Sequence, residues 1–322
     1  MHDLPPTRCR LLEPGLLTTV QDLGRVGYQR FGVPVAGPMD PWALRCANRL
    51  VGNPDNAAAI EVTIVGPSLL FERAAIVAWT GGDFPVSLNG AVIPGWQAVE
   101  IPAGSTLKIG TRQTGARGYL SIAGGIAVPP ILESRSTHLR SGMGGLGGHA
   151  LRAGDVLAGG EATPEAKGRV GCCIAPALRP GYSHSPTLRV IRGPQVEAFR
   201  PDAMDVLSRE RYTISREADR MGYRLHGAPL EHRNSPDIVS DATPLGSLQV
   251  PASRQPILLM ADRQTTGGYP KIAVVISADV PLAAQLVPGD TIGFTVVEVE
   301  EAQRVIREQY RELDLMLSPV GR

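Results

Sequence analysis

Long apolar runs are absent from this chain of 322 residues. No stretch approaches the roughly 20 apolar residues that a membrane-spanning helix needs. The N-terminal MHDLPPTRCRLLEPG also lacks the apolar segment of a secretory signal. The formal net charge is only +1, which leaves no strong field to attract nucleic acid or an anionic membrane. We therefore expect a cytoplasmic protein that binds neither nucleic acid nor membrane.

Cysteine is scarce, and its spacing carries no metal or redox motif. The four cysteines are Cys9, Cys46, Cys172 and Cys173, with no C-x-x-C pair among them. We expect four free thiols in a reducing compartment, with Cys9 and Cys46 serving as small core residues. The six histidines form neither H-E-x-x-H nor a tight Cys/His set, so we expect no metal site.

Aromatic residues make up only 5% of the chain, whereas glycine (37) and proline (28) are abundant. Short β-branched segments such as AIVAWTGG, STLKIG, KIAVVIS and TIGFTVVEV lie between glycine-containing turns. Helices are expected only at PWALRCANRL (with Asp40 as its N-cap), in DVPLAAQLV and in EEAQRVIREQYRELDLML. Because so few helices alternate with the strands, the pattern predicts a mainly β chain of antiparallel barrels.

The two halves share a short motif. RVGYQRFG (25–32) and RMGYRLHG (220–227) both read Arg-x-Gly-Tyr-x-x-x-Gly. This repeat indicates two related domains, although chance similarity in a glycine-rich chain is the alternative. The stretch 159–186 is rich in Gly, Ala, Pro and Ser, so we place the boundary there and expect domains at 1–180 and 181–322.

The segment ADRQTTGGYPKI (261–272) is the strongest local candidate for a site. It contains Lys271, one of only three lysines. Backbone N–H groups at the Thr-Thr-Gly-Gly turn can bind an oxyanion, with Lys271 adding positive charge and Asp262 accepting a proton. A plain β-hairpin turn with a solvated lysine is the alternative. We predict Lys271 and Asp262 as catalytic, and as substrate-binding Gln249, Gln264, Thr265, Thr266, Gly267 and Gly268.

Arginines beside the repeated motif are further candidates. Arg220 and Arg224 could clamp a carboxylate or phosphate in the bidentate way that guanidinium favours. Gln21, Asp22 and Arg25 occupy the first copy, where a turn with a structural Asp–Arg pair is the alternative. The loop GMGGLG from residue 142 fits G-x-G-x-x-G but follows no strand and opens no helix. We therefore interpret it as a mobile or partner-contacting loop and not as a nucleotide site.

Five ordered motifs resemble one known family. They are TTVQDLGRVGYQRFGVPVAGPMD, ANRLVGNPDNAAAIEVT, SRSTHLR, DRMGYRL and QVPASRQPILLMADRQTTGGYPKI, covering nearly the whole chain. Together they resemble allophanate hydrolase subunit 2, the biotin-dependent carboxyltransferase-like family that includes the C subunit of 5-oxoprolinase. The chain departs from the family pattern at three positions. Glu133 and Arg254 stand where glycine is expected, and His149 stands where arginine is expected.

The resemblance implies two cyclophilin-like β-barrel domains and a role in an enzyme complex. It favours a subunit of an ATP-dependent 5-oxoprolinase, which opens the 5-oxoproline lactam to glutamate. The implied partners are a protein like the B subunit of 5-oxoprolinase and a lactam-utilisation protein like its A subunit, with ATP and Mg used in the complex. No Met-Lys-Met site for biotin attachment is present. The alternatives are a carboxyltransferase subunit of a urea carboxylase-type enzyme and a regulatory module that pairs with a kinase-inhibitor-like subunit.

Overall fold

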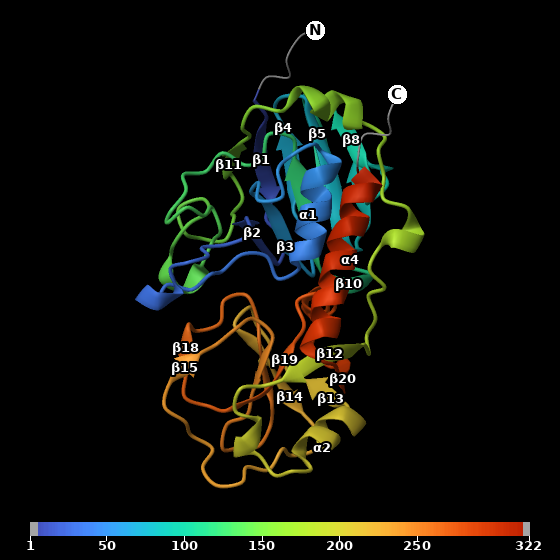
Figure 1. The fold of residues 1–322 in the computed structure, drawn as a ribbon. Coiled ribbons are helices and arrows are strands. Elements are labelled where there is room, and N and C mark those ends of the chain that lie inside the picture. The colour runs from blue at the N-terminus through green and yellow to red at the C-terminus, as the bar shows by residue number, and fades with distance from the viewer. Residues whose placement is uncertain (1–5, 318–322) are drawn as a thin grey trace. The chain divides into compact units, whose positions relative to one another are not determined.

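The computed structural model describes residues 6–317, which form two compact units (Figure 1). The first unit contains the described residues up to Arg25 together with Ala36–Pro180. The second contains Gly181–Leu315 and also Val26–Val35, a segment from the N-terminal part of the chain. Strands dominate both units and helices are few, so the predicted mainly β fold class is confirmed.

The first unit consists of two antiparallel sheets. Their buried apolar side chains, including Leu11 and Leu69 from one sheet and Ile60 and Leu120 from the other, form a single core cluster. The six-stranded sheet has the order β11 (Val156–Ala158), β1 (Arg8–Glu13), β4 (Ser68–Phe71), β9 (Ser105–Ile109), β6 (Val86–Leu88) and β7 (Ala91–Val92). The five-stranded sheet has the order β2 (Leu17–Gln21), β3 (Ala59–Thr63), β10 (Thr114–Ile122), β5 (Ala75–Asp83) and β8 (Ala98–Ile101).

Helix α1 (Pro41–Leu50) covers the second of these sheets and begins where the sequence predicts. The Asp40 carboxylate accepts a hydrogen bond from the backbone N–H of Ala43 at 2.9 Å, which caps the first turn. The apolar face of α1 packs on β5 and β10, where it meets the fully buried Tyr119. Gly52 follows the helix with a φ of +78°, a left-handed conformation that glycine adopts without strain.

The second unit is built on a closed barrel of seven strands. Around the barrel the order is β12 (Thr187–Arg192), β19 (Lys271–Val275), β16 (Ser247–Gln249), β17 (Ile257–Leu259), β14 (Gly222–His226), β13 (Tyr212–Ile214) and β20 (Thr291–Val296). An odd number of strands cannot alternate in direction all the way around, so one neighbouring pair must be parallel. That pair is β12 with β20, whereas the other six pairs are antiparallel. A separate ladder joins β15 (Asp241–Ala242) to β18 (Thr266–Gly267).

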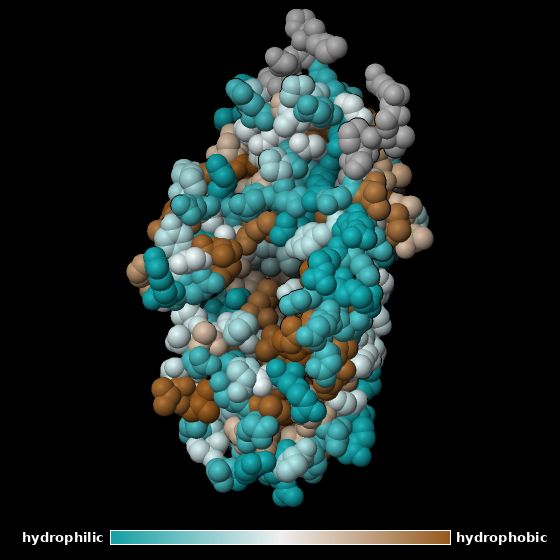
Figure 2. All heavy atoms as spheres, in the orientation of Figure 1, coloured by the Kyte–Doolittle hydropathy of each residue, from teal (hydrophilic) through white to brown (hydrophobic). Residues whose placement is uncertain are grey.

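The remaining helices are short except for the last. Besides α1, the α-helices within residues 6–317 are α2 (Ala203–Arg209), α3 (Val280–Ala284) and α4 (Val299–Leu317). The 3-10 helices are η1 (Gln29–Phe31), η2 (Leu139–Ser141), η3 (Pro164–Arg169), η4 (Pro176–Leu178) and η5 (Val196–Ala198). Hydrophilic residues face the viewer along α4 (Figure 2). Within this helix Arg304 pairs with Glu301 and Glu308. No helix in the described part of the chain is long and apolar enough to span a membrane.

The two copies of the repeated motif adopt different structures. The second copy forms β14 of the barrel, whereas the first contains η1. An aspartate turn lies near the start of each copy, but at a different offset from the motif. The Asp22 carboxylate accepts from the N–H of Gly24 at 2.9 Å, and the Asp219 carboxylate accepts from the N–H of Met221 at 2.8 Å. The sequence similarity therefore does not correspond to two equivalent strands.

All four cysteines are free, as predicted. Cys9 and Cys46 are buried in the first unit, and burial raises the pKa of the Cys9 thiol to about 12. Cys172 is half-buried and Cys173 is exposed.

Candidate functional site

The predicted lysine is buried against a carboxylate. Lys271 is the first residue of β19, and its side chain is 1% exposed. Its Nζ lies 2.9 Å from Oδ2 of Asp241, whose side chain is 48% exposed. The hairpin alternative required a solvated lysine, whereas this lysine is buried. Its ammonium pairs with a carboxylate that is itself half exposed.

Gln195 joins the two members of this pair. Its side-chain Nε2 donates to Asp241 Oδ2 at 3.0 Å, and its Oε1 accepts from the backbone N–H of Lys271 at 3.2 Å. The hydrogen bond from Lys271, followed by those from Gln195 and the Ala242 N–H, lowers the pKa of Asp241. The carboxylate is therefore ionised at neutral pH, and its exposed side can accept hydrogen bonds from a ligand.

The Lys271 ammonium keeps hydrogen-bonding capacity. An ammonium carries three donors, and within residues 6–317 the one acceptor bonded to Nζ is Asp241. Two donors thus remain on a group that is almost fully buried. A buried donor without a partner is unfavourable, so this ammonium favours a ligand that brings an acceptor oxygen.

Two glutamines continue the polar cluster. Gln264 Nε2 donates to Gln249 Oε1 at 3.0 Å, and Gln249 Nε2 donates to the backbone carbonyl of Tyr269 at 3.3 Å. Gln249 lies opposite Lys271 in the ladder of β16 and β19. A Cβ at Gly267 would lie 2.6 Å from Gln249 Nε2, so any other residue there would displace the Gln249 amide.

The Thr-Thr-Gly-Gly segment forms a short strand instead of the open turn that we predicted. Thr266 and Gly267 are β18, paired with β15. The carbonyl of Thr265 accepts from the Thr243 N–H at 3.1 Å, and that of Gly268 accepts from the Ile238 N–H at 2.8 Å. The ladder holds Asp241 beside Lys271, which is a positioning role that the sequence did not reveal.

A cavity of about 280 Å³ borders this cluster. Its volume lies near the lower end of the range for small-molecule pockets. Arg263 in its wall donates from Nε to the Thr243 carbonyl at 2.8 Å. Burial lowers the pKa of Arg263 to about 10, which still leaves the guanidinium charged at neutral pH. The cavity is lined by Gln29, Val35, Ala242, Thr243, Pro244, Arg263, Gln264 and Thr265.

Asp262 and Arg220, predicted for catalysis and binding, pair with each other. Arg220 Nε and Nη2 lie 2.9 and 3.0 Å from the two Asp262 oxygens, and both side chains are less than 10% exposed. This bidentate pair links the turn before β14 to the turn that follows β17, so its contacts favour a structural role. Arg224 lies elsewhere, exposed on β14, and pairs with Glu217 at 2.8 Å.

Gln21, Asp22 and Arg25 lie in the first unit and are almost fully buried. Asp22 accepts from the hydroxyl of Ser136 at 2.7 Å, and Arg25 donates to the Ser136 carbonyl. Gln21 Nε2 donates to the Thr137 carbonyl at 3.1 Å. The three side chains tie the 134–137 segment to the end of β2, and their contacts favour structure over ligand binding.

The three departures from the family pattern have different structural settings. Glu133 and Arg254 have φ values of +62° and +60°, so both stand in the left-handed conformation that glycine favours. His149 Nδ1 lies 2.8 Å from the carbonyl of Ala150 and 3.9 Å from Asp155. The backbone thus has a conformation that favours glycine at the two positions where the resemblance predicts glycine.

Two features of the chain bear on the predicted absence of a metal site and on the glycine loop. Within residues 6–317 no group of three or more His, Cys, Asp or Glu side chains could hold a metal ion. The glycines from 142 to 148 fold onto the 135–138 segment, with the Gly145 N–H donating to the Arg135 carbonyl at 2.9 Å. The use of ATP and Mg in the complex stays a prediction.

Comparison with known proteins gives the family. The family described as carboxyltransferase domain, subdomain A and B, matches residues 31–296. The chain belongs to this family, which confirms the resemblance predicted from its motifs. It is 39% identical to the C subunit of 5-oxoprolinase from Haemophilus influenzae, covering 92% of this chain and 93% of the relative. It is 38% identical to the same subunit from Escherichia coli, covering 94% and 95%.

A solved structure shows the same fold in a larger protein. The crystal structure of the K. lactis urea amidolyase aligns with a TM-score of 0.88 and 33% identity. The alignment covers 98% of this chain but only 20% of the amidolyase chain. The fold is therefore shared by proteins named for two different activities.

Proposed function

We propose that this chain is a subunit of an ATP-dependent 5-oxoprolinase that opens the 5-oxoproline lactam to glutamate. In this proposal it acts with a protein like the B subunit of that enzyme and a lactam-utilisation protein like its A subunit. Support comes from the two relatives named as the C subunit of 5-oxoprolinase, which match over more than nine-tenths of both chains. The observation that carries it is the buried Lys271 with two free donors, joined to the half-exposed carboxylate of Asp241.

A lactam presents an N–H donor next to a carbonyl acceptor, and the cluster offers the complementary pair. The ionised Asp241 accepts the lactam N–H, while the Lys271 ammonium donates to the carbonyl oxygen. Negative charge develops on that oxygen when water adds to the carbonyl carbon, so a preorganised cation stabilises the transition state more than the substrate. The ring C–N bond then breaks, and the nitrogen takes up a proton to give the amine of glutamate. For the opening to be coupled to ATP, the γ-phosphoryl group would pass to the carbonyl oxygen with release of ADP, and the acyl phosphate left after C–N cleavage would be hydrolysed by a second water to glutamate and phosphate.

Carboxyl transfer is the second candidate, and the structural match to urea amidolyase favours it. Urea also places N–H donors beside a carbonyl oxygen, so Asp241 and Lys271 would orient it in the same way. The difference lies in the co-substrate, which would be a carboxylated biotin carried by another domain or chain.

The test is ATP hydrolysis by the chain reconstituted with its partner subunits, with 5-oxoproline and urea supplied separately. We expect turnover with 5-oxoproline, and a loss of about 10²–10³-fold in kcat for Lys271→Met, the range for removing one oxyanion donor. Asp241→Asn should lower turnover as well, since the amide cannot hold the ammonium in place. Arg233→Gln is the matched control, because Arg233 is exposed and lines neither cavity.

The complex must remain assembled in each variant, which co-purification shows. An assembled Lys271→Met complex that retains full 5-oxoproline turnover would refute the role given to the lysine. Turnover with urea and carboxybiotin, and none with 5-oxoproline, would replace the lactam proposal with the carboxyl-transfer one.

A further inference from the structure

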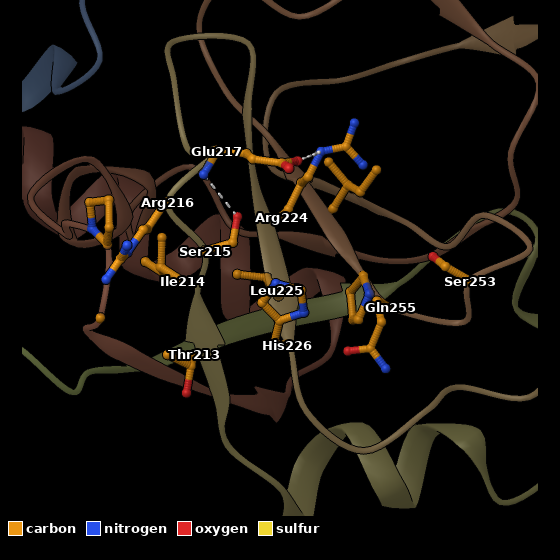
Figure 3. A pocket seen from close by; sticks show the side chains of 14 residues that line it. Thr213, Ile214, Ser215, Arg216, Glu217, Arg224, Leu225, His226, Ser253 and Gln255 are labelled. Atoms are coloured by element: carbon orange, nitrogen blue, oxygen red, sulfur yellow. Dashed lines mark hydrogen bonds and ion pairs between the residues drawn. The ribbon is translucent and has the colours of Figure 1, made fainter.

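A larger cavity of about 740 Å³ lies on the second unit, apart from the candidate site (Figure 3). It shares no lining residue with the 280 Å³ cavity. Strands β13, β14 and β17 supply its walls, together with the loops after β13, before β17 and before β20. Apolar walls come from Ile214, Leu225, Pro256, Ile257 and Pro288.

Several polar groups of this cavity have hydrogen-bonding capacity left for a ligand. Arg216 is exposed and makes no hydrogen bond or ion pair with any residue of the described chain. The His226 side chain likewise has no bonded partner within residues 6–317. Arg224 bonds through Nε to Glu217, which leaves its two terminal nitrogens available. Figure 3 shows this ion pair on one side of Ser215 and Arg216 on the other. The cavity therefore has an excess of positive charge.

Glu217 indicates what Arg224 can bind. Its carboxylate lies 2.8 Å from the guanidinium, yet the two side chains are 73% and 57% exposed. An exposed pair of this kind contributes little to stability, so a competing carboxylate can replace Glu217 at small cost. The opposite wall is fixed, because the Gln255 amide both donates to the Gly227 carbonyl at 3.1 Å and accepts from its N–H at 2.9 Å.

We propose that this cavity binds a small organic carboxylate with an apolar body. Its volume is that of a pocket for a single small molecule. The apolar walls favour a hydrocarbon portion, and Arg224 and Arg216 favour the anion in the bidentate geometry of guanidinium and carboxylate. A small hydrophilic anion would leave the walls uncovered, and a neutral apolar molecule would leave the guanidinium groups without a partner.

Isothermal titration calorimetry of the full chain tests this with three probes: 4-phenylbutyrate, its neutral amide, and acetate. We expect 4-phenylbutyrate to bind at least about tenfold more tightly than either control, because a hydrogen bond to a charged group is roughly worth that factor. Arg224→Gln should weaken its binding about tenfold and Arg216→Gln severalfold. Arg233→Gln, an exposed arginine outside the cavity, should change nothing.

Glu217→Gln provides the sharpest readout. If the carboxylate of Glu217 competes with the ligand for Arg224, its removal should tighten 4-phenylbutyrate binding about two- to fivefold. Equal binding of the amide, or no response to Arg224→Gln and Glu217→Gln, would overturn the proposal. Binding of an acidic peptide with none of the small carboxylates would also overturn it, in favour of a protein partner.

Discussion

The turn at Ile131–Ser134 contains a strain that a single substitution should relieve. Ile131 and Ser134 exchange backbone hydrogen bonds at 2.8 and 3.3 Å, and Leu132 and Glu133 between them have φ values of +50° and +62°. Two consecutive positive φ angles are those of a type I′ turn, for which Asn-Gly is preferred. Leu132 and Glu133 therefore occupy a conformation that is unfavourable for both.

Glu133→Gly should raise the free energy of unfolding of the first unit. A non-glycine residue in the left-handed region costs about 1–2 kcal/mol. Glycine offsets about 0.5–1 kcal/mol of this gain in stability, because it has more conformational freedom in the unfolded chain. The exposed Glu133 side chain has no bonded partner among residues 6–317, so nothing else is lost. The net gain is about 0.5–1 kcal/mol, or roughly 2 °C in Tm for a unit of this size.

The assay is thermal and guanidinium unfolding followed by tryptophan fluorescence. All three tryptophans, Trp42, Trp79 and Trp96, lie in the first unit, so the signal reports this unit alone. Glu133→Ala is the matched control, since it removes the same side chain and keeps the strained φ. Equal stabilities for the glycine and alanine variants would show that the backbone angle is not the source of the strain.

Three further predictions follow from burial and charge. Asp262→Asn should lower the free energy of unfolding by about 3 kcal/mol, because the buried Arg220 loses its carboxylate partner. Urea unfolding followed by circular dichroism measures this loss, and a much smaller loss would show that the pair is dispensable. A thiol reagent at pH 8 should label Cys172 and Cys173 and reach the two buried cysteines only after unfolding; rapid labelling of all four in the folded chain would contradict their burial. The pKa of Asp241 in the folded chain lies below its ordinary value of 3.8. The Asp241 carboxylate therefore stays ionised, and contributes to activity, until the pH falls below about 4. An acid limb at pH 5–6 in the activity profile would have to come from another group.

Local structure was largely readable from the sequence. The capping aspartate, the following proline and the glycine after the helix marked both ends of α1, and PILLM and KIAVV marked β17 and β19. The closure of the barrel was not readable, because the pairing of β12 with β20 joins segments about a hundred residues apart. The repeated motif did not predict local structure, since its first copy contains a 3-10 helix while its second forms a strand.

Long-range contacts in the candidate site were likewise not readable from the sequence. Lys271 is conspicuous in the sequence because lysine is rare and this one follows a glycine turn. Asp241 and Gln195 are not, because they stand 30 and 76 residues before it and no periodic pattern links them. The sequence predicts Asp262 and Arg220 as separate chemical groups, whereas the fold pairs them with each other. Sequence reveals unusual residues, but long-range packing decides which charges neutralise one another.

The parallel pairing of β12 and β20 also affects the aggregation of an incomplete chain. Strand β20 bonds to β12 on one side and to β13 on the other. A ribosome-bound or truncated chain that stops before Thr291 has two strand edges with unsatisfied backbone groups, which are templates for intermolecular pairing. Chaperone binding or aggregation is thus expected for premature stops throughout the second unit, even when the lost residues number only a few dozen.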